Sequence, residues 1–311
     1  MTAAPGAAPS AWESKTVDLG TQVHYADFGG SGEVMVLVHG IASSHLNWMG
    51  FGEELARQFR VFAVDLPGYG LSPRGDQPAT VQNSQQQLDR FIDHVSPGAP
   101  VVLFGHSMGG LVSIMEASAH PEKLSRLILL APAGPYPRRS AATLLAAPFL
   151  VATVMPGRSA ALMRRGGRRL DPERTVRDII SRIVAPGSTV SEEVMKAHVD
   201  LLVRQRREHD WTEQALVESA GSIVKSSLRR KRFRAMVHRI TVPTLLMHGT
   251  RDRLVPYRAG ALLHRVRPDW SWRPLARLGH MAHMENPPVV LQTVNDWLAA
   301  QRLLDNLRAA G

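Results

Sequence analysis

The chain has 311 residues, of which 44% are hydrophobic and 21% charged, and it contains no cysteine. This length can bury a full hydrophobic core, either as one large α/β domain with an insertion or as two smaller domains. The lack of cysteine excludes disulfides and thiol chemistry, and the formal net charge of +10 raises the question of acidic partners.

Residues 1–12 are rich in alanine, proline and glycine, and we expect them to be flexible. They lack the basic start and apolar stretch of a signal peptide, so we expect a cytoplasmic protein. From residue 13 onward, β-type runs alternate with amphipathic helical runs, as a mostly parallel sheet with helices on both faces requires. The expected strands are 16–19, 22–28, 34–38, 61–64, 101–104 and 126–130, and the expected helices are 51–58, 81–95 and 111–119.

Between residues 134 and 240 the pattern changes to helical periods that glycine and proline turns interrupt. This change predicts a helical cap, or lid, inserted into a core made of residues 13–133 and 241–311. The strand and helix alternation then resumes and completes an α/β fold with a mostly parallel sheet of eight-stranded type. The remaining expected strands are 244–247 and 270–275, and the remaining expected helices are 257–266 and 288–307.

The first part of the predicted cap, residues 141–155, carries no charge and contains Leu145 and Phe149. It is too short to span a bilayer. We interpret it as a lid helix that packs on the core. In the alternative interpretation, one side of this segment faces an apolar acyl pocket or lies on a lipid interface, which makes Leu145 and Phe149 candidate pocket residues.

Most of the excess positive charge comes from arginines in the predicted cap, at residues 164–169, 204–207 and 229–234. We interpret these clusters as solvated helix faces, with a weak contact to a lipid or anionic surface as the alternative. The chain has no zinc-finger spacing, no aromatic RNA-binding signature and no obvious helix-turn-helix. We therefore expect no specific binding of nucleic acid.

Residues 105–110 read Gly-His-Ser-Met-Gly-Gly, and they follow an apolar β-type run and precede a helical run. A Gly-x-Ser-x-Gly sequence between a strand and a helix is typical of a nucleophile elbow, which predicts Ser107 as a nucleophile. The start of the following helix points unpaired N–H groups at a forming oxyanion, so the N–H of Met108 is one expected donor. The turn His39-Gly40-Ile41-Ala42 supplies the other, the N–H of Ile41.

A serine hydroxyl needs an imidazole to accept its proton and a carboxylate to orient that imidazole. His280 follows a glycine after the last expected strand and is the favoured base, while His283 is the alternative and otherwise orients the loop or lines the pocket. Asp252 leaves strand 244–247 in a turn, 28 residues before His280, which leaves room for one helix and one strand. Asp65 is a rival carboxylate by position, and we interpret it as a loop-shaping residue.

The same loops supply further candidates for the substrate pocket, namely His39, Trp48, His106 and His283. The pair His280-x-x-His283 has the spacing of two metal ligands but lacks a third ligand at metal-site spacing. We therefore expect no metal site and no cofactor.

Taken together, these motifs resemble those of α/β-hydrolase-fold serine hydrolases with a helical cap, over nearly the whole chain after the first dozen residues. The resemblance implies an acyl-enzyme on Ser107, proton transfer by His280 oriented by Asp252, and hydrolysis by water without a metal or organic cofactor. A serine at the elbow speaks against the epoxide hydrolase and haloalkane dehalogenase branches, which place aspartate there. The motifs are His39-Gly40, Asp65-Leu66-Pro67-Gly68-Tyr69-Gly70, residues 105–110, His248-Gly249-Thr250-Arg251-Asp252 and Gly279-His280.

The favoured function is hydrolysis of a small carboxylic ester with an apolar acyl group. The first alternative is carbon–carbon bond hydrolysis of ring-cleavage products, although Ile41-Ala42-Ser43-Ser44 and His106 depart from the glycine-proline-rich loop and the asparagine common in that branch. A perhydrolase or haloperoxidase-like side reaction is a further alternative. The non-enzymatic alternative is a ligand receptor, since a fold does not fix a function.

Overall fold

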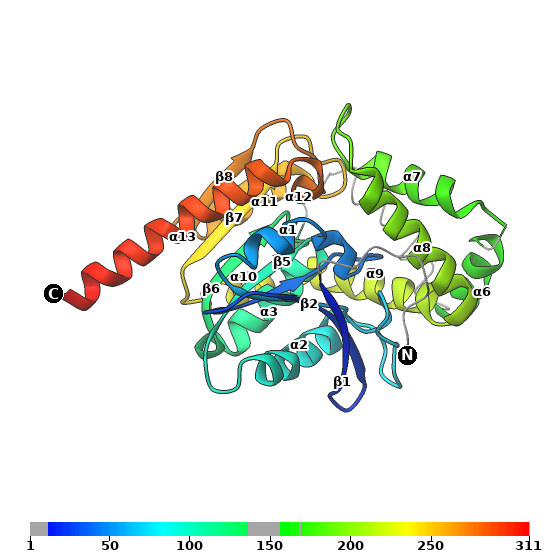
Figure 1. The fold of residues 1–311 in the computed structure, drawn as a ribbon, viewed down its shortest axis with the longest axis horizontal. Helices are drawn as coiled ribbons and strands as arrows, with labels where there is room; N and C mark the ends of the chain where they lie inside the picture. The colour runs from blue at the N-terminus through cyan, green and yellow to red at the C-terminus, as the bar shows by residue number, and fades with distance from the viewer. Residues whose placement is uncertain (1–11, 136–155, 168, 311) are drawn as a thin grey trace.

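The β-type runs of the sequence form the eight strands of one central sheet (Figure 1). The protein is described here by a computed structural model, which covers residues 12–135, 156–167 and 169–310. The predicted lid segment with Leu145 and Phe149 lies outside the described residues. The strands are β1 (Glu13–Asp18), β2 (Gln22–Gly29), β3 (Val34–Val38), β4 (Arg60–Val64), β5 (Val101–His106), β6 (Leu124–Leu130), β7 (Thr244–Gly249) and β8 (Ser271–Leu275).

The strand order in the sheet is β1-β2-β4-β3-β5-β6-β7-β8. β2 runs antiparallel to both of its neighbours, and every pair from β4 to β8 is parallel. The chain leaves β3 toward β4 on one side and returns to β5 on the other side of β3. The carboxyl ends of β3 and β5 therefore flank a switch in strand order, which is where open α/β sheets bind ligands.

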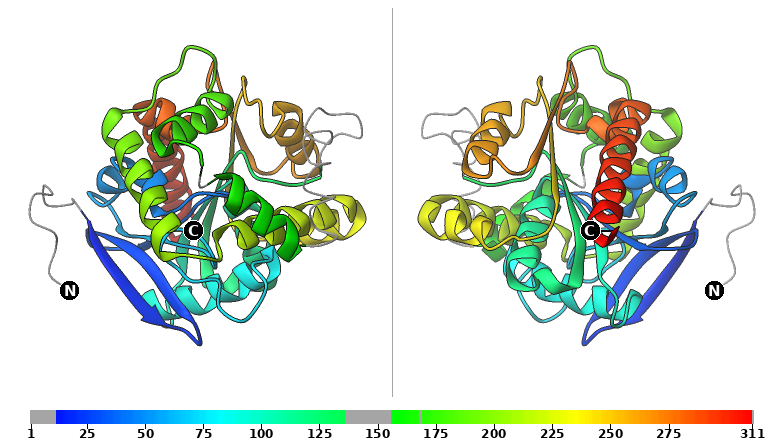
Figure 2. Two further views of the ribbon diagram at one scale, coloured as in Figure 1. Left: turned by 90° about the vertical axis from the view of Figure 1, so that its right-hand side faces the viewer. Right: turned by 90° about the vertical axis from the view of Figure 1, so that its left-hand side faces the viewer.

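Helices cover both faces of the sheet because each face carries apolar side chains (Figure 2). One apolar cluster joins the sheet to α2 (Val81–Val95), α3 (Met108–Ala119) and α11 (Tyr257–Val266). The other joins it to α1 (Phe51–Leu55), α12 (Ala282–Glu285) and α13 (Pro287–Ala310). These layers confirm the predicted fold class, an α/β protein with a mostly parallel eight-stranded sheet and helices on both faces.

The predicted helices differ from the observed ones mainly at their ends. The helix expected at 51–58 ends at Leu55, and residues 56–58 form the turn that brings buried Phe59 to the start of β4. The helix expected at 288–307 corresponds to α13, and a short helix that was not predicted, α12, precedes it. The two are separate because the residue before Pro287 is disfavoured in a helical conformation. Asn286 accordingly has φ −150° and ψ 74°.

Between β6 and β7 the described residues form helices, as expected for a helical insertion. In Figure 1, α7 and α8 lie beside α12. α9 and α10 contribute Ala215, Ile223 and Val237 to the same apolar cluster as α2 and α3. Among the described helices, none is both long enough and apolar enough to cross a bilayer. The helices are α6 (Pro156–Gly167), α7 (Pro172–Ile183), α8 (Glu192–Glu208), α9 (Thr212–Leu228) and α10 (Arg230–His238).

Candidate active site

Ser107 occupies a sharp turn between β5 and α3, with φ 54° and ψ −117°. A positive φ is unfavourable for a residue with a side chain, so the surrounding contacts must hold this conformation in place. The Ser107 N–H donates to the carbonyl oxygen of Leu130 at 3.0 Å, and its own carbonyl accepts from Leu111 N at 3.1 Å and Ala133 N at 2.8 Å. The turn has the strained geometry that a nucleophile elbow requires.

The two glycines of the motif are needed because the backbone packs closely around the turn. A Cβ on Gly105 would lie 2.4 Å from Ser113 Oγ, and one on Gly109 would lie 2.3 Å from the carbonyl oxygen of Val38. The second distance also shows that the start of α3 touches the end of β3. The motif therefore fixes the position of Ser107 relative to the neighbouring strand.

Three side chains from separate loops form a continuous line of hydrogen bonds. The Ser107 hydroxyl lies 2.9 Å from His280 Nε2, and His280 Nδ1 lies 2.7 Å from Asp252 Oδ2. Ser107 follows β5, Asp252 follows β7 and His280 follows β8, all at the carboxyl edge of the parallel strands. The structure thus joins His280, and not His283, to the serine.

The side chain of Asp252 is completely buried and receives several hydrogen bonds. Its Oδ1 accepts from the N–H groups of Leu254 at 2.9 Å and Val255 at 2.8 Å, and its Oδ2 lies 3.3 Å from His248 Nε2. Burial by itself raises the pKa of the Asp252 carboxyl, but the charge and hydrogen bonds of His280 and His248 outweigh burial and lower this pKa below its ordinary value. An ionised Asp252 accepts from the Nδ1–H of His280 and leaves Nε2 free to accept the serine proton.

The turn after β3 passes directly beside Ser107. A Cβ on Gly40 would lie 3.1 Å from Ser107 Cβ, and Ala42 in the same turn has φ 54°. Ile41 lies between these two residues and is partly buried. Met108 is the first residue of α3, so its N–H belongs to the unpaired group at a helix start. Both predicted oxyanion donors thus lie on segments next to Ser107.

His106 packs against the imidazole of His280, and His283 packs against His106. His106 Nε2 donates to the carbonyl oxygen of His280 at 2.9 Å, and the two rings are 4.8 Å apart. His283 lies 4.7 Å from the His106 ring, and neither of its ring nitrogens has a hydrogen-bond partner among the described residues. Burial lowers the pKa of His283 to about 3, and burial followed by the neighbouring histidines lowers the pKa of His106. Both side chains are therefore neutral near pH 7.

The other two predicted pocket residues are fully buried among packing contacts. Trp48 lies 5.1 Å from the Phe104 ring and 4.7 Å from the His283 ring. His39 donates from Nδ1 to the carbonyl oxygen of Gly40 at 2.7 Å and accepts at Nε2 from Leu66 N at 3.0 Å. Trp48 and His39 therefore support the loops by packing and hydrogen bonding, and they do not line an exposed pocket.

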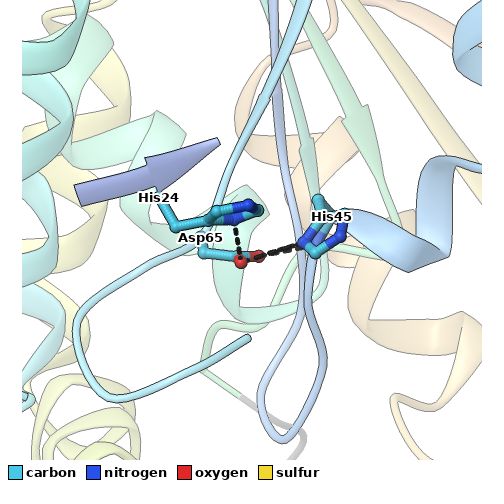
Figure 3. Close-up of side chains that lie close together, drawn as sticks. All are labelled: His24, His45 and Asp65. Carbon is cyan, nitrogen blue, oxygen red and sulfur yellow. Dashed lines mark hydrogen bonds and ion pairs between the residues drawn. The ribbon is translucent and has the colours of Figure 1, made fainter. Parts of the chain in front are cut away.

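Asp65 organises a second, separate cluster with His24 and His45 (Figure 3). Its Oδ2 accepts from His24 Nδ1 at 2.7 Å, from His45 Nδ1 at 2.9 Å and from Leu71 N at 2.9 Å. Its Oδ1 accepts from His45 N at 2.7 Å. These contacts hold the loops together, as a loop-shaping residue should, and the sequence alone gave no sign of the two histidine partners.

Among the described residues, two groups of side chains bring three potential metal-ligand atoms together. Around Asp65, three N–H groups point at one carboxylate oxygen, so hydrogens occupy the position that a cation would need. In the other group, formed by Asp89, Glu116 and His120, the ammonium of Lys123 already binds Asp89. Neither arrangement favours a metal ion.

A cavity of about 300 Å³ lies between α10, α11 and the loop after β6. Phe233, Leu263 and Val266 give it an apolar lining, and the basic residues at its α10 side are Arg230, Lys231 and Arg234. Ser107, Asp252 and His280 are not among its lining residues.

Comparisons with known proteins identify the family to which this fold belongs. The family model described as alpha/beta hydrolase fold matches residues 33–287. The chain is 26% identical over 285 residues to the uncharacterized hydrolase YugF of Bacillus subtilis, covering 91% of this chain and 96% of that protein. It is 26% identical over 292 residues to a 2-hydroxy-6-oxononadienedioate/2-hydroxy-6-oxononatrienedioate hydrolase of Cupriavidus pinatubonensis, covering 91% and 93%.

A solved structure of a thermophilic esterase from Thermogutta terrifontis, with malate bound, shares the fold. Its TM-score is 0.66 at 24% sequence identity, covering 93% of this chain and 98% of that chain. The matched residues 33–287 include β3 to β8 and the three hydrogen-bonded side chains. The chain therefore belongs to the alpha/beta hydrolase fold family of hydrolases.

Proposed function

We propose that this hydrolase cleaves carboxylic esters through an acyl-enzyme on Ser107. The observation that carries the proposal is the line of hydrogen bonds from Ser107 Oγ through His280 to Asp252, at 2.9 and 2.7 Å. The strained backbone of Ser107 supports it, because this turn presents the hydroxyl clear of the sheet edge. A buried and ionised Asp252 supports the role of His280 as a base.

In the proposed mechanism, Ser107 Oγ attacks the ester carbonyl carbon while His280 Nε2 accepts the hydroxyl proton. The N–H groups of Ile41 and Met108 donate to the oxyanion of the tetrahedral intermediate. His280 then returns the proton to the leaving alcohol, and the acyl group remains bonded to Ser107. A water molecule attacks this acyl-enzyme, with His280 again accepting a proton, and the carboxylic acid product leaves with Ser107 restored.

We propose a small ester with an apolar acyl group as the substrate, on the uncharged sequence of residues 141–155. The basic clusters of the insertion are partly matched by acidic neighbours, for example Arg204 with Glu208 at 2.8 Å and Arg164 with Glu213 at 3.4 Å. These ion pairs favour a solvated helix face over a surface dedicated to nucleic acid or lipid.

A second candidate function is hydrolysis of a carbon–carbon bond in a ring-cleavage product, because relatives at 26% identity bear that activity in their names. The same serine, histidine and aspartate serve either reaction. The two candidates differ in the substrate, so turnover of simple esters against turnover of a 2-hydroxy-6-oxo-dienoate separates them.

The test is hydrolysis of p-nitrophenyl esters of increasing acyl length by the wild type and by Ser107→Ala, with a fluorophosphonate probe for the serine. We expect turnover and labelling to disappear together in the variant. Residual catalysis after loss of the nucleophile is about 10³ to 10⁴ over water in well-studied serine hydrolases. Full activity of Ser107→Ala contradicts the proposal, and labelling without ester turnover favours the carbon–carbon reaction.

A further inference from the structure

The carboxylate of Glu285 joins the loop that carries His280 to the insertion. Its Oε2 accepts from Gly279 N at 2.8 Å and from Ala185 N at 3.1 Å, and its Oε1 accepts from Met281 N at 3.1 Å. Gly279 and Met281 are the two neighbours of His280 in the chain. Ala185 follows α7 in the insertion, so one half-buried side chain connects two segments about a hundred residues apart in sequence.

The backbone of His280 is held from two sides. Its N–H donates to the carbonyl oxygen of Ile183, at the end of α7, at 3.0 Å. Its carbonyl oxygen accepts from His106 Nε2, beside the nucleophile, at 2.9 Å. The insertion therefore binds the N–H of His280, and the core binds its carbonyl oxygen.

The two segments also approach too closely to slide past each other. A Cβ on Gly279 would lie 2.3 Å from Ala185 N and 2.7 Å from the carbonyl carbon of Val184. Such distances leave no space for any side chain at residue 279 without movement of the backbone.

Apolar packing reinforces the contact. Met281, just before α12, and Met284, within it, form a buried apolar cluster with the insertion. The insertion contributes Val176, Ile180 and Val184 of the α7 region and Met195 of α8. These side chains form one cluster to which the His280 loop and the insertion both contribute. The side chains of the His280 loop are thus packed between those of the insertion.

From these contacts we propose that Glu285 is a positioning residue for His280, clamping the His280 loop to residues 183–185 of the insertion. The proposal rests on the proposed function only in naming His280 as the base. It has a structural consequence of its own, since α7 cannot separate from the core without disturbing the position of the imidazole.

Glu218 provides a matched control within the same chain. It lies on α9, and its Oε2 accepts from the core backbone N–H of Ala79 at 2.7 Å. Like Glu285, it is a carboxylate that joins the insertion to the core through a backbone N–H group. It does not touch the His280 loop, so Glu218→Gln loosens a comparable junction without affecting His280.

The first test compares Glu285→Gln with Glu218→Gln. A carboxamide presents one acceptor oxygen, so Glu285→Gln turns its NH₂ group toward at least one of the three N–H donors. We expect kcat for ester hydrolysis to fall by about 10- to 100-fold in Glu285→Gln with KM little changed, because small misplacements of catalytic groups cost rates of this size. Glu218→Gln should keep the wild-type kcat.

The second readout does not require turnover. The Nδ1 proton of His280, hydrogen-bonded to Asp252, should give a low-field imidazole resonance in proton NMR, assigned by its loss in His280→Asn. We expect this resonance to shift or broaden in Glu285→Gln and to remain unchanged in Glu218→Gln. If the wild type shows the resonance but no ester turnover, the proposed function fails while the clamp is still tested. An unchanged resonance together with unchanged kcat in Glu285→Gln overturns the clamp, as does an equal loss of kcat in both variants.

A measurement on the wild type covers the case in which Glu285→Gln does not fold. In amide hydrogen exchange, a clamp requires the N–H groups of Gly279, His280, Met281 and Ala185 to be protected to a similar degree, because they open together. Fast exchange at Ala185 and His280 beside slow exchange at Gly279 and Met281 would mean that the insertion separates freely, and would overturn the proposal.

Discussion

At the scale of single residues, Asp252 and its rival Asp65 differ in their histidine partners. Both carboxylates are buried and accept backbone N–H groups. Only Asp252 contacts a histidine that is also hydrogen-bonded to Ser107. This histidine is His280, whose Nδ1 lies 2.7 Å from Asp252 Oδ2. The identity of the partners, and not burial or charge, therefore separates the catalytic candidate from the loop-shaping carboxylate.

Replacing Asp252 by asparagine should leave the fold intact and reduce kcat by about 10⁴-fold, as for the equivalent change in other serine hydrolases. The reason is that the carboxamide oxygen can still accept from Leu254 N and Val255 N, while its NH₂ group then faces His280 Nδ1 and favours the wrong tautomer. Steady-state kinetics beside the circular dichroism spectrum test this. Asp269→Asn, which removes a carboxylate paired with Arg267, is the control and should keep wild-type kcat.

At the scale of elements, the start of α3 is fixed by its contact with the end of β3. Gly109 makes this contact possible because a Cβ there would lie 2.3 Å from the carbonyl oxygen of Val38 and 2.4 Å from that of His39. Both neighbours are backbone atoms, which cannot rotate away as a side chain can. A larger residue must therefore move the helix start, together with Ser107 and the N–H of Met108.

We expect Gly109→Ala to lower the unfolding free energy by about 1 to 3 kcal/mol, the usual cost of overpacking, and to lower kcat as well. Gly157 of α6 offers the control, since a Cβ there meets nothing within 4 Å. Gly157→Ala should leave both quantities close to wild type. Urea unfolding measures the unfolding free energy of the two variants, and ester kinetics measure their kcat. Equal unfolding free energies would contradict the close contact between α3 and β3.

The elements and the Ser107, Asp252 and His280 set were accessible from sequence because their signals are local. Strands such as β3 and β5 are short apolar runs bounded by glycine or proline, and the elbow motif occupies a few consecutive residues. The histidine partners of Asp65 and the Ala185 partner of Glu285 were not accessible. His24 is 41 residues from Asp65 and Ala185 is 100 residues from Glu285, and no periodicity relates such positions. Only the packing of the whole chain brings them together.

At the scale of the whole molecule, the buried histidines link stability to pH. Burial lowers the pKa of His39, His106, His198 and His283 in the folded chain. An unfolded histidine has a pKa near 6.5. Below that pH the unfolded state binds protons that the folded state does not, so the unfolding free energy falls as pH falls.

For His283, whose folded pKa is about 3, this loss extends from about pH 6.5 down to about pH 3. We expect His283→Gln to remove up to about 1.4 kcal/mol per pH unit from the pH dependence of the unfolding free energy in that range. Urea unfolding at pH 7.5 and pH 5 gives the change in unfolding free energy between the two pH values for the wild type and for the variant. Because each change is taken within one protein, a general loss of stability in the variant cancels. Parallel dependence in the two proteins would be inconsistent with a neutral buried His283.

The apolar cluster shared by Met281, Met284 and the α7 and α8 helices also bears on chimeric proteins built from relatives of this chain. An insertion transplanted from this chain as a continuous block would bring Val176, Ile180 and Met195 to the recipient but leave their two methionine partners behind in the donor. Exchange of substrate preference by such a graft therefore requires residues 281–284 to travel with the block, although two strands and one helix of the core (β7, α11 and β8) separate them from it in the sequence.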